Sequence, residues 1–204
     1  MYTGTLIDEL MATVERAEKH ALHVRSQEEK LAYFYNVAQS ELARYDSLTG
    51  LANRANFLER LDLELARHRR LHRPFGLAVL DCDNFKAVND AHGHLEGDRL
   101  LRLTATTLQG VLRKTDLACR LGGDEFALLL PETDAVSALK VIDAVVTRLH
   151  EATSRDGWGA SFSAGVGVYQ QAPANAEAAL TSADRLMYEV KRGGKHGHKM
   201  EVFP

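Results

Sequence analysis

Four carboxylates follow or precede apolar runs in two short segments, the Leu-Asp-Cys-Asp stretch at 80–83 and the Gly-Gly-Asp-Glu stretch at 122–125. Side chains alternate along a strand, so Asp81 and Asp83 should share one face. If a hairpin at 122–125 pairs beside the first strand, Asp81 and Asp124 converge, and converging acids repel unless a cation or a shared proton compensates. The pattern predicts a hard divalent cation with oxygen ligands. Mg²⁺ keeps positions open for phosphates, which indicates phosphoryl transfer.

The glycine-rich turn also has a simpler interpretation. A Gly-Gly-Asp-Glu turn alone is most often a hairpin with solvated acids, since glycine permits tight backbone geometry. The second acidic strand end, at 80–83, favours a ligand site instead.

The segment 83–98, which follows the acidic strand end at 80–83, is dense in hydrogen-bonding side chains. There Lys86 could reach a phosphate, Asn89 can donate and accept, and Asp98 can accept two donors side by side, as guanine presents them. Each of these residues alone is also typical of a turn or a helix cap.

A sheet is needed to position these residues. From Pro74 onward, apolar runs that suit buried strands alternate with segments of helical periodicity, and one hairpin interrupts the alternation. We expect strands at 75–85, 116–121, 125–131, 160–169 and 198–203, and helices at 96–113, 134–153 and 175–194. This order predicts an α/β (α+β) fold, with a mixed central sheet flanked by helices.

One more helix is expected before this sheet. The Leu-Thr-Gly-Leu-Ala-Asn-Arg turn at 48–54 breaks the upstream pattern, and either Asn53 or Asn56 could cap the helix that follows. The basic end of that helix, at 67–73, could suggest nucleic acid. Basic residues in a last helical turn commonly complement the helix dipole, however, and a net charge of −3 gives no strong field for polyanions. We therefore expect no nucleic-acid partner.

The first 45 residues carry a seam of mostly apolar positions that recur at alternating steps of four and three. The seam comprises Leu10, Val14, Ala17, Ala21, Val24, Glu28, Leu31, Tyr35, Ala38, Leu42 and Tyr45. One interpretation is an amphipathic helix folded back on its own domain, and the other is a parallel coiled-coil dimer. A helix of about 40 residues would be about 60 Å long, longer than the domain it would cover, so we favour the dimer.

The composition suits one globular domain with an added element. The chain has 204 residues, of which 45% are hydrophobic and 26% are charged. No apolar run approaches the length of a membrane span, and the charged opening residues do not resemble a signal peptide. The two cysteines, Cys82 and Cys119, lie in strand-like runs and are expected to be reduced, as in a cytoplasmic protein.

Four motifs, in order, resemble those of the GGDEF family of diguanylate cyclases. They lie at 46–54, 81–101, 122–126 and 183–195. The first resembles the family's Asp-x-Leu-Thr-Gly-Leu-x-Asn-Arg opening, the second its Asp-x-Asp-x-Phe-Lys block, the third its signature and the fourth its closing Ala-Asp stretch. The resemblance implies a GGDEF domain at 46–204, resembling the nucleotidyl cyclase/polymerase palm fold. A signalling and coiled-coil helix at 1–45 would precede it.

The resemblance also implies a reaction, in which two GTP condense to cyclic di-GMP and two pyrophosphates on a homodimer with one GTP per subunit. The family's metal ligands correspond to Asp81, the carbonyl of Cys82, Asp124 and Glu125, and the implied ion is Mg²⁺, for which Mn²⁺ could substitute. Its catalytic residues correspond to Asp124, Glu125 and Lys86. Its substrate-binding residues correspond to Gly122, Gly123, Asn89, His94, Asp98, Lys191 and Lys195. In these roles, Asn89 and Asp98 read guanine, and the lysines contact phosphates.

A product-binding site is implied as well. Arg113 and Asp116 form an Arg-x-x-Asp motif at the offset of the family's inhibitory site for cyclic di-GMP, although a surface ion pair of little energetic value would give the same spacing. Two positions depart from the family pattern. Cys82 replaces the usual aliphatic residue, which matters little because only its carbonyl is needed. Lys195 stands where arginine is common, so a phosphate contact there could be monodentate rather than bidentate.

The sequence is also compatible with two rival functions. A catalytically silent GGDEF domain would bind GTP or cyclic di-GMP as a receptor, but such domains usually lose signature acids that are present here. A coiled-coil scaffold with a passive globular head is the other rival.

The sequence does not reveal an input signal, and no sensory domain fits before Asp46. We therefore expect the chain to be either the output piece of a longer sensor or a protein recruited through its helix.

Overall fold

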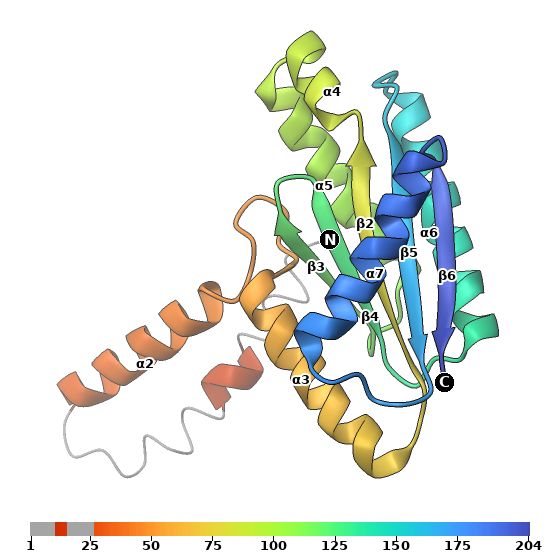
Figure 1. Ribbon diagram of the computed structural model, residues 1–204. Coiled ribbons are helices and arrows are strands. Elements are labelled where there is room, and N and C mark those ends of the chain that lie inside the picture. The colour runs from red at the N-terminus through yellow and green to blue at the C-terminus, as the bar shows by residue number, and fades with distance from the viewer. Residues whose placement is uncertain (1–10, 16–26) are drawn as a thin grey trace.

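The computed structural model describes residues 11–15 and 27–204, which include one six-stranded sheet covered by helices (Figure 1). The strands are β1 (Ala52–Asn53), β2 (Phe75–Asp83), β3 (Leu117–Gly122), β4 (Glu125–Leu130), β5 (Ser161–Tyr169) and β6 (Gly197–Phe203). The helices are α2 (Gln27–Leu42), α3 (Arg54–Leu71), α4 (Phe85–His92), α5 (His94–Val111), α6 (Ala135–Arg155) and α7 (Ala176–Arg192).

The sheet is mixed and runs in the order β1-β3-β4-β2-β5-β6. The central strand, β2, pairs antiparallel with β4 on one side and with β5 on the other. The outer pairs, β1 with β3 and β5 with β6, are parallel. The β3–β4 hairpin therefore lies beside β2, which is the arrangement that the sequence required for the two acidic segments to meet. The mixed sheet flanked by helices confirms the predicted fold class.

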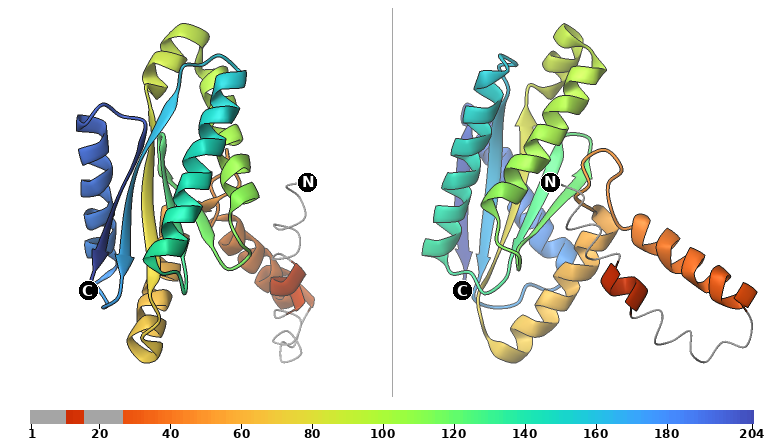
Figure 2. Two further views of the ribbon diagram at one scale, coloured as in Figure 1. Left: turned by 90° about the vertical axis from the view of Figure 1, so that its right-hand side faces the viewer. Right: turned by 180° about the vertical axis from the view of Figure 1, so that it is seen from behind.

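Helices cover both faces of the sheet, and alternate residues of the buried β2 serve the two layers (Figure 2). Ala78 and Leu80 belong to the cluster that packs under α5 and α6. Leu77 and Val79 belong to the cluster that packs under α3 and α7. By the same alternation, Asp81 points to the α7 side of the sheet.

The element boundaries differ from the predicted ones at a few places. The segment after β2 forms a separate short helix, α4, and α5 begins at His94, two residues earlier than expected. β1, of two residues, was not predicted because it is too short to show alternation. Asn53 rather than Asn56 caps α3, since its side chain accepts a bond from the backbone N–H of Asn56 at 3.0 Å. Both cysteines are free and buried, as expected.

The helix α2 projects away from the sheet in Figure 1 and in the right view of Figure 2. Leu31 and Tyr35, one turn apart on the predicted seam, are 73% and 64% exposed, so at these positions the helix is not folded back on its domain. The seam positions at 10, 17, 21 and 24, and the side chains at 28, 38 and 42, lie outside the described residues.

Candidate active site

The acids predicted to form the site meet where β2 ends beside the start of β4. Asp81 is the register partner of Glu125. The backbone N–H of Cys82 donates to the carbonyl of Asp124 at 3.2 Å, which holds the hairpin turn against the end of β2. Only 6% of Asp81 is exposed, so its charge is largely removed from water. Three carboxylates from segments over 40 residues apart thus gather at one edge of the sheet.

The electrostatics of this edge are those of crowded acids. Burial, and next the negative charge of Asp81, raises the pKa of Asp124, and the same two causes raise the pKa of Glu125. A cation at this position would relieve that repulsion and lower both pKa values. The arrangement therefore favours binding of positive charge among the three carboxylates.

Lysines from the end of α7 supply part of that positive charge. The Nζ of Lys191 lies 2.6 Å from Oδ2 of Asp81. Partial burial works to lower the pKa of Lys191, but the hydrogen bond and charge of Asp81 outweigh it, so the pKa is raised and the amine stays protonated. Lys195, in the turn after α7, donates from Nζ to Oδ1 of Asn84 at 2.8 Å. Both ammonium groups therefore lie at the end of β2, Lys191 against Asp81 and Lys195 against the residue that follows the strand.

The turn that carries Asp124 is built on glycine and held by Arg120. Gly122 and Gly123 have φ values of 154° and 52°, which side chains disfavour. Arg120 donates from Nε and Nη2 to the carbonyl of Gly123 at 2.9 and 2.8 Å, while its Nη1 bonds both carboxylate oxygens of Asp46. No role was predicted for Arg120 or Asp46, although Asp46 lies in the motif at 46–54 and Arg120 in the strand predicted at 116–121.

The residues predicted to read guanine lie on α4 and α5. Asn89 packs directly over Gly97, because a Cβ added to Gly97 would lie 1.9 Å from Oδ1 of Asn89. Asp98, the next residue, is partly exposed and lies 4.0 Å from Arg102. The structure thus brings Asn89 to the helical turn that bears Asp98. Lys86 and His94 are exposed at the start of these two helices.

The donor set at the strand ends consists of oxygen. The Cys82 side chain packs into the core under α5 and α6, and burial raises the pKa of its thiol, so the sulfur is not a ligand. Asp81, Asp124 and Glu125 offer only carboxylates, which fits a hard divalent ion. Within residues 11–15 and 27–204, no three His, Cys, Asp or Glu side chains are grouped so that they could hold a metal ion by themselves. A metal here would need further oxygen ligands from the backbone, phosphates or water.

The Arg113–Asp116 motif occupies the loop between α5 and β3, at the opposite end of β3 from the glycine turn. The backbone N–H of Arg113 donates to Oδ2 of Asp116 at 3.0 Å, and the N–H of Asp116 donates to the carbonyl of Arg113 at 3.0 Å. These bonds close the loop through the Arg113 backbone, and the Arg113 side chain is exposed. The motif is separate from the acids.

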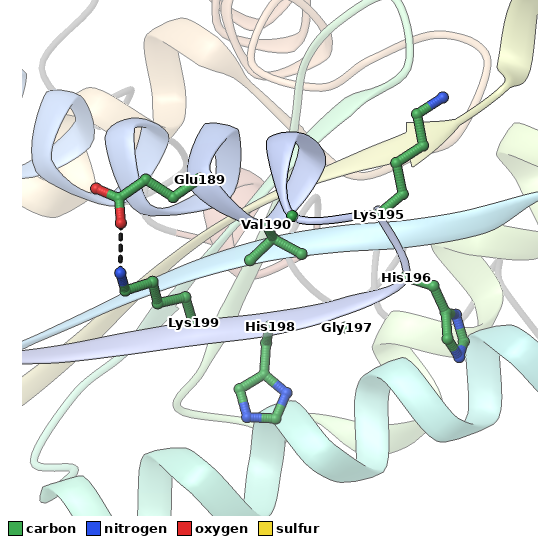
Figure 3. A pocket seen from close by; sticks show the side chains of 8 residues that line it. Glu189, Val190, Lys195, His196, Gly197, His198 and Lys199 are labelled. Carbon is green, nitrogen blue, oxygen red and sulfur yellow. Dashed lines mark hydrogen bonds and ion pairs between the residues drawn. The ribbon is translucent and has the colours of Figure 1, made fainter.

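A pocket of about 430 Å³ adjoins the site at the turn between α7 and β6 (Figure 3). Its lining includes Lys195, His196 and His198, together with Glu189 and Lys199, which pair with each other across the pocket. Of the predicted site residues only Lys195 lines it, so this pocket is a neighbour of the predicted nucleotide site rather than the site itself.

The family described as diguanylate cyclase, GGDEF domain, matches residues 43–197. The chain belongs to the GGDEF family. It is 35% identical over 189 residues to diguanylate cyclase DgcP of Pseudomonas aeruginosa, covering 91% of this chain but 27% of that protein. It is 36% identical over 160 residues to the probable diguanylate cyclase DgcE of Escherichia coli, covering 75% of this chain and 14% of that protein. The chain thus spans under a third of these two relatives.

Solved GGDEF structures share the fold. The diguanylate cyclase SiaD of Pseudomonas aeruginosa, solved in complex with its activator SiaC, superposes with a TM-score of 0.71 at 31% identity, over 97% of this chain and 76% of that one. The coiled coil and GGDEF domain of DgcB from Caulobacter crescentus, in complex with c-di-GMP, gives 0.67 at 26% identity, over 99% and 100%. Among the described residues, no helix combines the length and apolarity needed to cross a membrane.

Proposed function

We propose that this GGDEF domain is a diguanylate cyclase, which joins two GTP into cyclic di-GMP and releases two pyrophosphates. Each 3′-hydroxyl attacks the α-phosphate of the other GTP, so two bonds to pyrophosphate break as two phosphodiester bonds form. The observation that carries the proposal is the meeting of Asp81, Asp124 and Glu125 at the strand ends, with Lys191 against Asp81. Curated relatives that carry the name diguanylate cyclase support it.

Each side chain of the site has a task in this reaction. Asp124 is proposed to help remove the proton of the 3′-hydroxyl, a role that its raised pKa suits. Lys86 is proposed to stabilise charge on the phosphates, and Lys191 and Lys195 to hold the terminal phosphates. Asn89 and Asp98 are proposed to read the guanine edge, with His94 beside the nucleotide, and Gly122 and Gly123 to let the backbone approach it.

The oxygen donors suit Mg²⁺, with Mn²⁺ able to substitute, held by Asp81, the Cys82 carbonyl, Asp124 and Glu125. When bound, the ion would supply charge stabilisation to the triphosphate. GGDEF diguanylate cyclases are in general metal-dependent.

Two domains must meet, because each holds one GTP and the product contains two. The exposed Leu31 and Tyr35 on α2 support a parallel coiled-coil homodimer. An isolated 16-residue helix is only marginally stable in water, so a partner helix would stabilise it. The solved coiled coil and GGDEF domain of DgcB offer a related arrangement.

Arg113 and Asp116 are proposed to bind the product, cyclic di-GMP, and its binding there is proposed to inhibit the enzyme.

The test is direct. Purified protein is incubated with GTP and MgCl₂, and cyclic di-GMP is measured by chromatography and mass spectrometry. Asp124→Ala and Asp81→Ala should each lower turnover by about 10³-fold or more, roughly 4 kcal/mol of transition-state stabilisation. Binding of GTP or cyclic di-GMP without product from the unmutated protein would indicate a receptor instead. Normal turnover by either folded variant would overturn the site.

A further inference from the structure

Asp83 is buried at the end of β2, and none of the roles proposed above uses it. Only 2% of the residue is exposed. Its carboxylate accepts bonds from Ser161 Oγ at 2.8 Å and from Ser163 Oγ at 2.8 and 3.0 Å, both on β5, and from the backbone N–H of His196 at 3.2 Å. Three donors, all neutral hydroxyl or amide groups, thus fix this charge in one orientation. Its partners show that it holds protein together rather than facing a ligand.

The bond to His196 fixes an unusual turn. Lys195 and His196 have φ values of 64° and 53°, so two consecutive residues with side chains adopt the left-handed region. Such a backbone persists only when its surroundings hold it. The N–H of Lys195 donates to the carbonyl of Val190 at 3.1 Å, and the His196 ring lies 4.8 Å from that of His150 on α6. The bond to Asp83 is the contact that joins this turn to β2.

The two turn side chains leave in different directions. Figure 3 shows the His196 ring directed toward α6, whereas Lys195 extends away from it. The Lys195 amine reaches Asn84, the residue after Asp83, at 2.8 Å. Two consecutive residues at the end of β2 therefore hold the turn. The Asp83 carboxylate accepts from the backbone N–H of His196, and the Asn84 side chain accepts from the Lys195 amine. The same strand end carries Asp81, so the position of the lysine is tied to that of the acids.

We propose that Asp83 is a positioning residue, which sets the place of Lys195 relative to Asp81 and thereby the binding of the terminal phosphates. This inference rests on the proposed GTP site. It predicts that loss of the Asp83 carboxylate has the same consequence as loss of the Lys195 amine, a weaker preference for a triphosphate over a diphosphate. A purely structural role would instead weaken both nucleotides alike.

The test compares α,β-methylene GTP with α,β-methylene GDP, which cannot release pyrophosphate or phosphate across that linkage. Dissociation constants of the full chain with MgCl₂ are measured by calorimetry for Asp83→Asn, Lys195→Ala and the double variant. Each single variant should lower the triphosphate-to-diphosphate preference by at least about threefold, as loss of a hydrogen bond to a charged group does. The double variant should be no worse than Lys195→Ala, because both changes act through one amine.

Controls separate positioning from stability and from the proposed function. Asp62→Asn removes an acid exposed on α3 and should leave the preference unchanged. If Asp83→Asn does not fold, Ser163→Ala removes the hydroxyl that holds Oδ1 and should show a smaller loss of the same preference. An unchanged preference in Lys195→Ala would overturn the phosphate role and this inference together. Two outcomes would overturn only the inference, provided that Lys195→Ala lowers the triphosphate-to-diphosphate preference. One is an unchanged preference in Asp83→Asn, and the other is additive losses of preference in the double variant.

Discussion

Asp46 and Arg120 form an ion pair at 3.1 Å although 74 residues separate them. Asp46 lies four residues after the end of α2, and Arg120 also holds the carbonyl of Gly123 in the turn that precedes Asp124. One guanidinium thus links the exit of the N-terminal helix to the turn that carries a proposed catalytic acid.

Arg120→Gln should loosen the turn and lower turnover, because glutamine cannot bond Asp46 and Gly123 at once. We expect a loss of about 1.5–3 kcal/mol in the free energy of unfolding, typical of a hydrogen bond to a charged group. Denaturant unfolding and cyclase assays would measure both. Arg60→Gln, at an exposed position on α3, is the matched control and should change neither. Full activity and stability in Arg120→Gln would show that the turn holds itself.

The Asp46 carboxyl gives this pair a pH dependence. Burial works to raise its pKa, but bonds from Thr49 and Arg120 outweigh it and hold the pKa below its usual value. The carboxylate therefore adds stability above the pKa of the unfolded chain, and this contribution is lost as pH falls through the folded pKa. Asp46→Asn should lower the free energy of unfolding at pH 7, and the gap from the unmutated protein should narrow at about pH 3. A gap that stays constant with pH would show that Asp46 does not act through its charge.

Asp124→Asn should separate stability from activity. Because the folded state raises the pKa of Asp124, through burial and then Asp81, its ionisation disfavours folding as pH rises through the unfolded and folded values. In the absence of metal, the variant should unfold at the same or a higher temperature than the unmutated protein at pH 7, yet make little cyclic di-GMP. Adding MgCl₂ should stabilise the unmutated protein more than the variant. A variant that melts lower without metal would contradict the picture of crowded acids.

Gly97→Ala should weaken GTP binding. A Cβ there would lie 1.9 Å from Oδ1 of Asn89, so Asn89 must move from the turn that bears Asp98. We expect KM for GTP to rise about 5- to 150-fold, since loss of a hydrogen-bond partner costs about 1–3 kcal/mol. Gly110→Ala is the control on the same helix, because nothing lies within 4 Å of its added Cβ. An unchanged KM in Gly97→Ala would remove Asn89 from the nucleotide site.

The sequence predicted the sheet and the meeting of acids because both follow from local patterns, namely alternation in β2 and a glycine turn before β4. It did not predict α4, whose eight residues resemble a polar loop. Nor did it assign roles to Asp83 or Arg120. Their partners, Ser161 and Asp46, lie 78 and 74 residues away, and spacing alone does not say which distant hydroxyl or carboxylate a buried charge will meet.

Arg113→Ala tests the product site. The Arg113 guanidinium is exposed while the loop is closed by backbone bonds, so the side chain can fork onto a phosphate or a guanine edge. The variant should keep its initial rate but lose inhibition by added cyclic di-GMP. Lys114→Ala, at the neighbouring exposed position, should stay inhibited. Equal inhibition in all three proteins would reduce the motif to a surface loop.

Leu31→Asp tests whether α2 brings two sites together. Leu31 is 73% exposed on the predicted seam, where a charge would oppose pairing with the same residue of a second copy. We expect light scattering to shift toward monomer and specific activity to fall strongly at dilute protein, because two domains then meet only by diffusion. Activity per subunit should recover as protein concentration rises, and GTP binding per subunit should persist, since every proposed pocket residue follows residue 80.

The control, Asn36→Asp, places the same charge on an exposed position off the seam and should leave both mass and activity unchanged. A Leu31→Asp monomer that is equally active at every concentration would show that α2 does not assemble the enzyme.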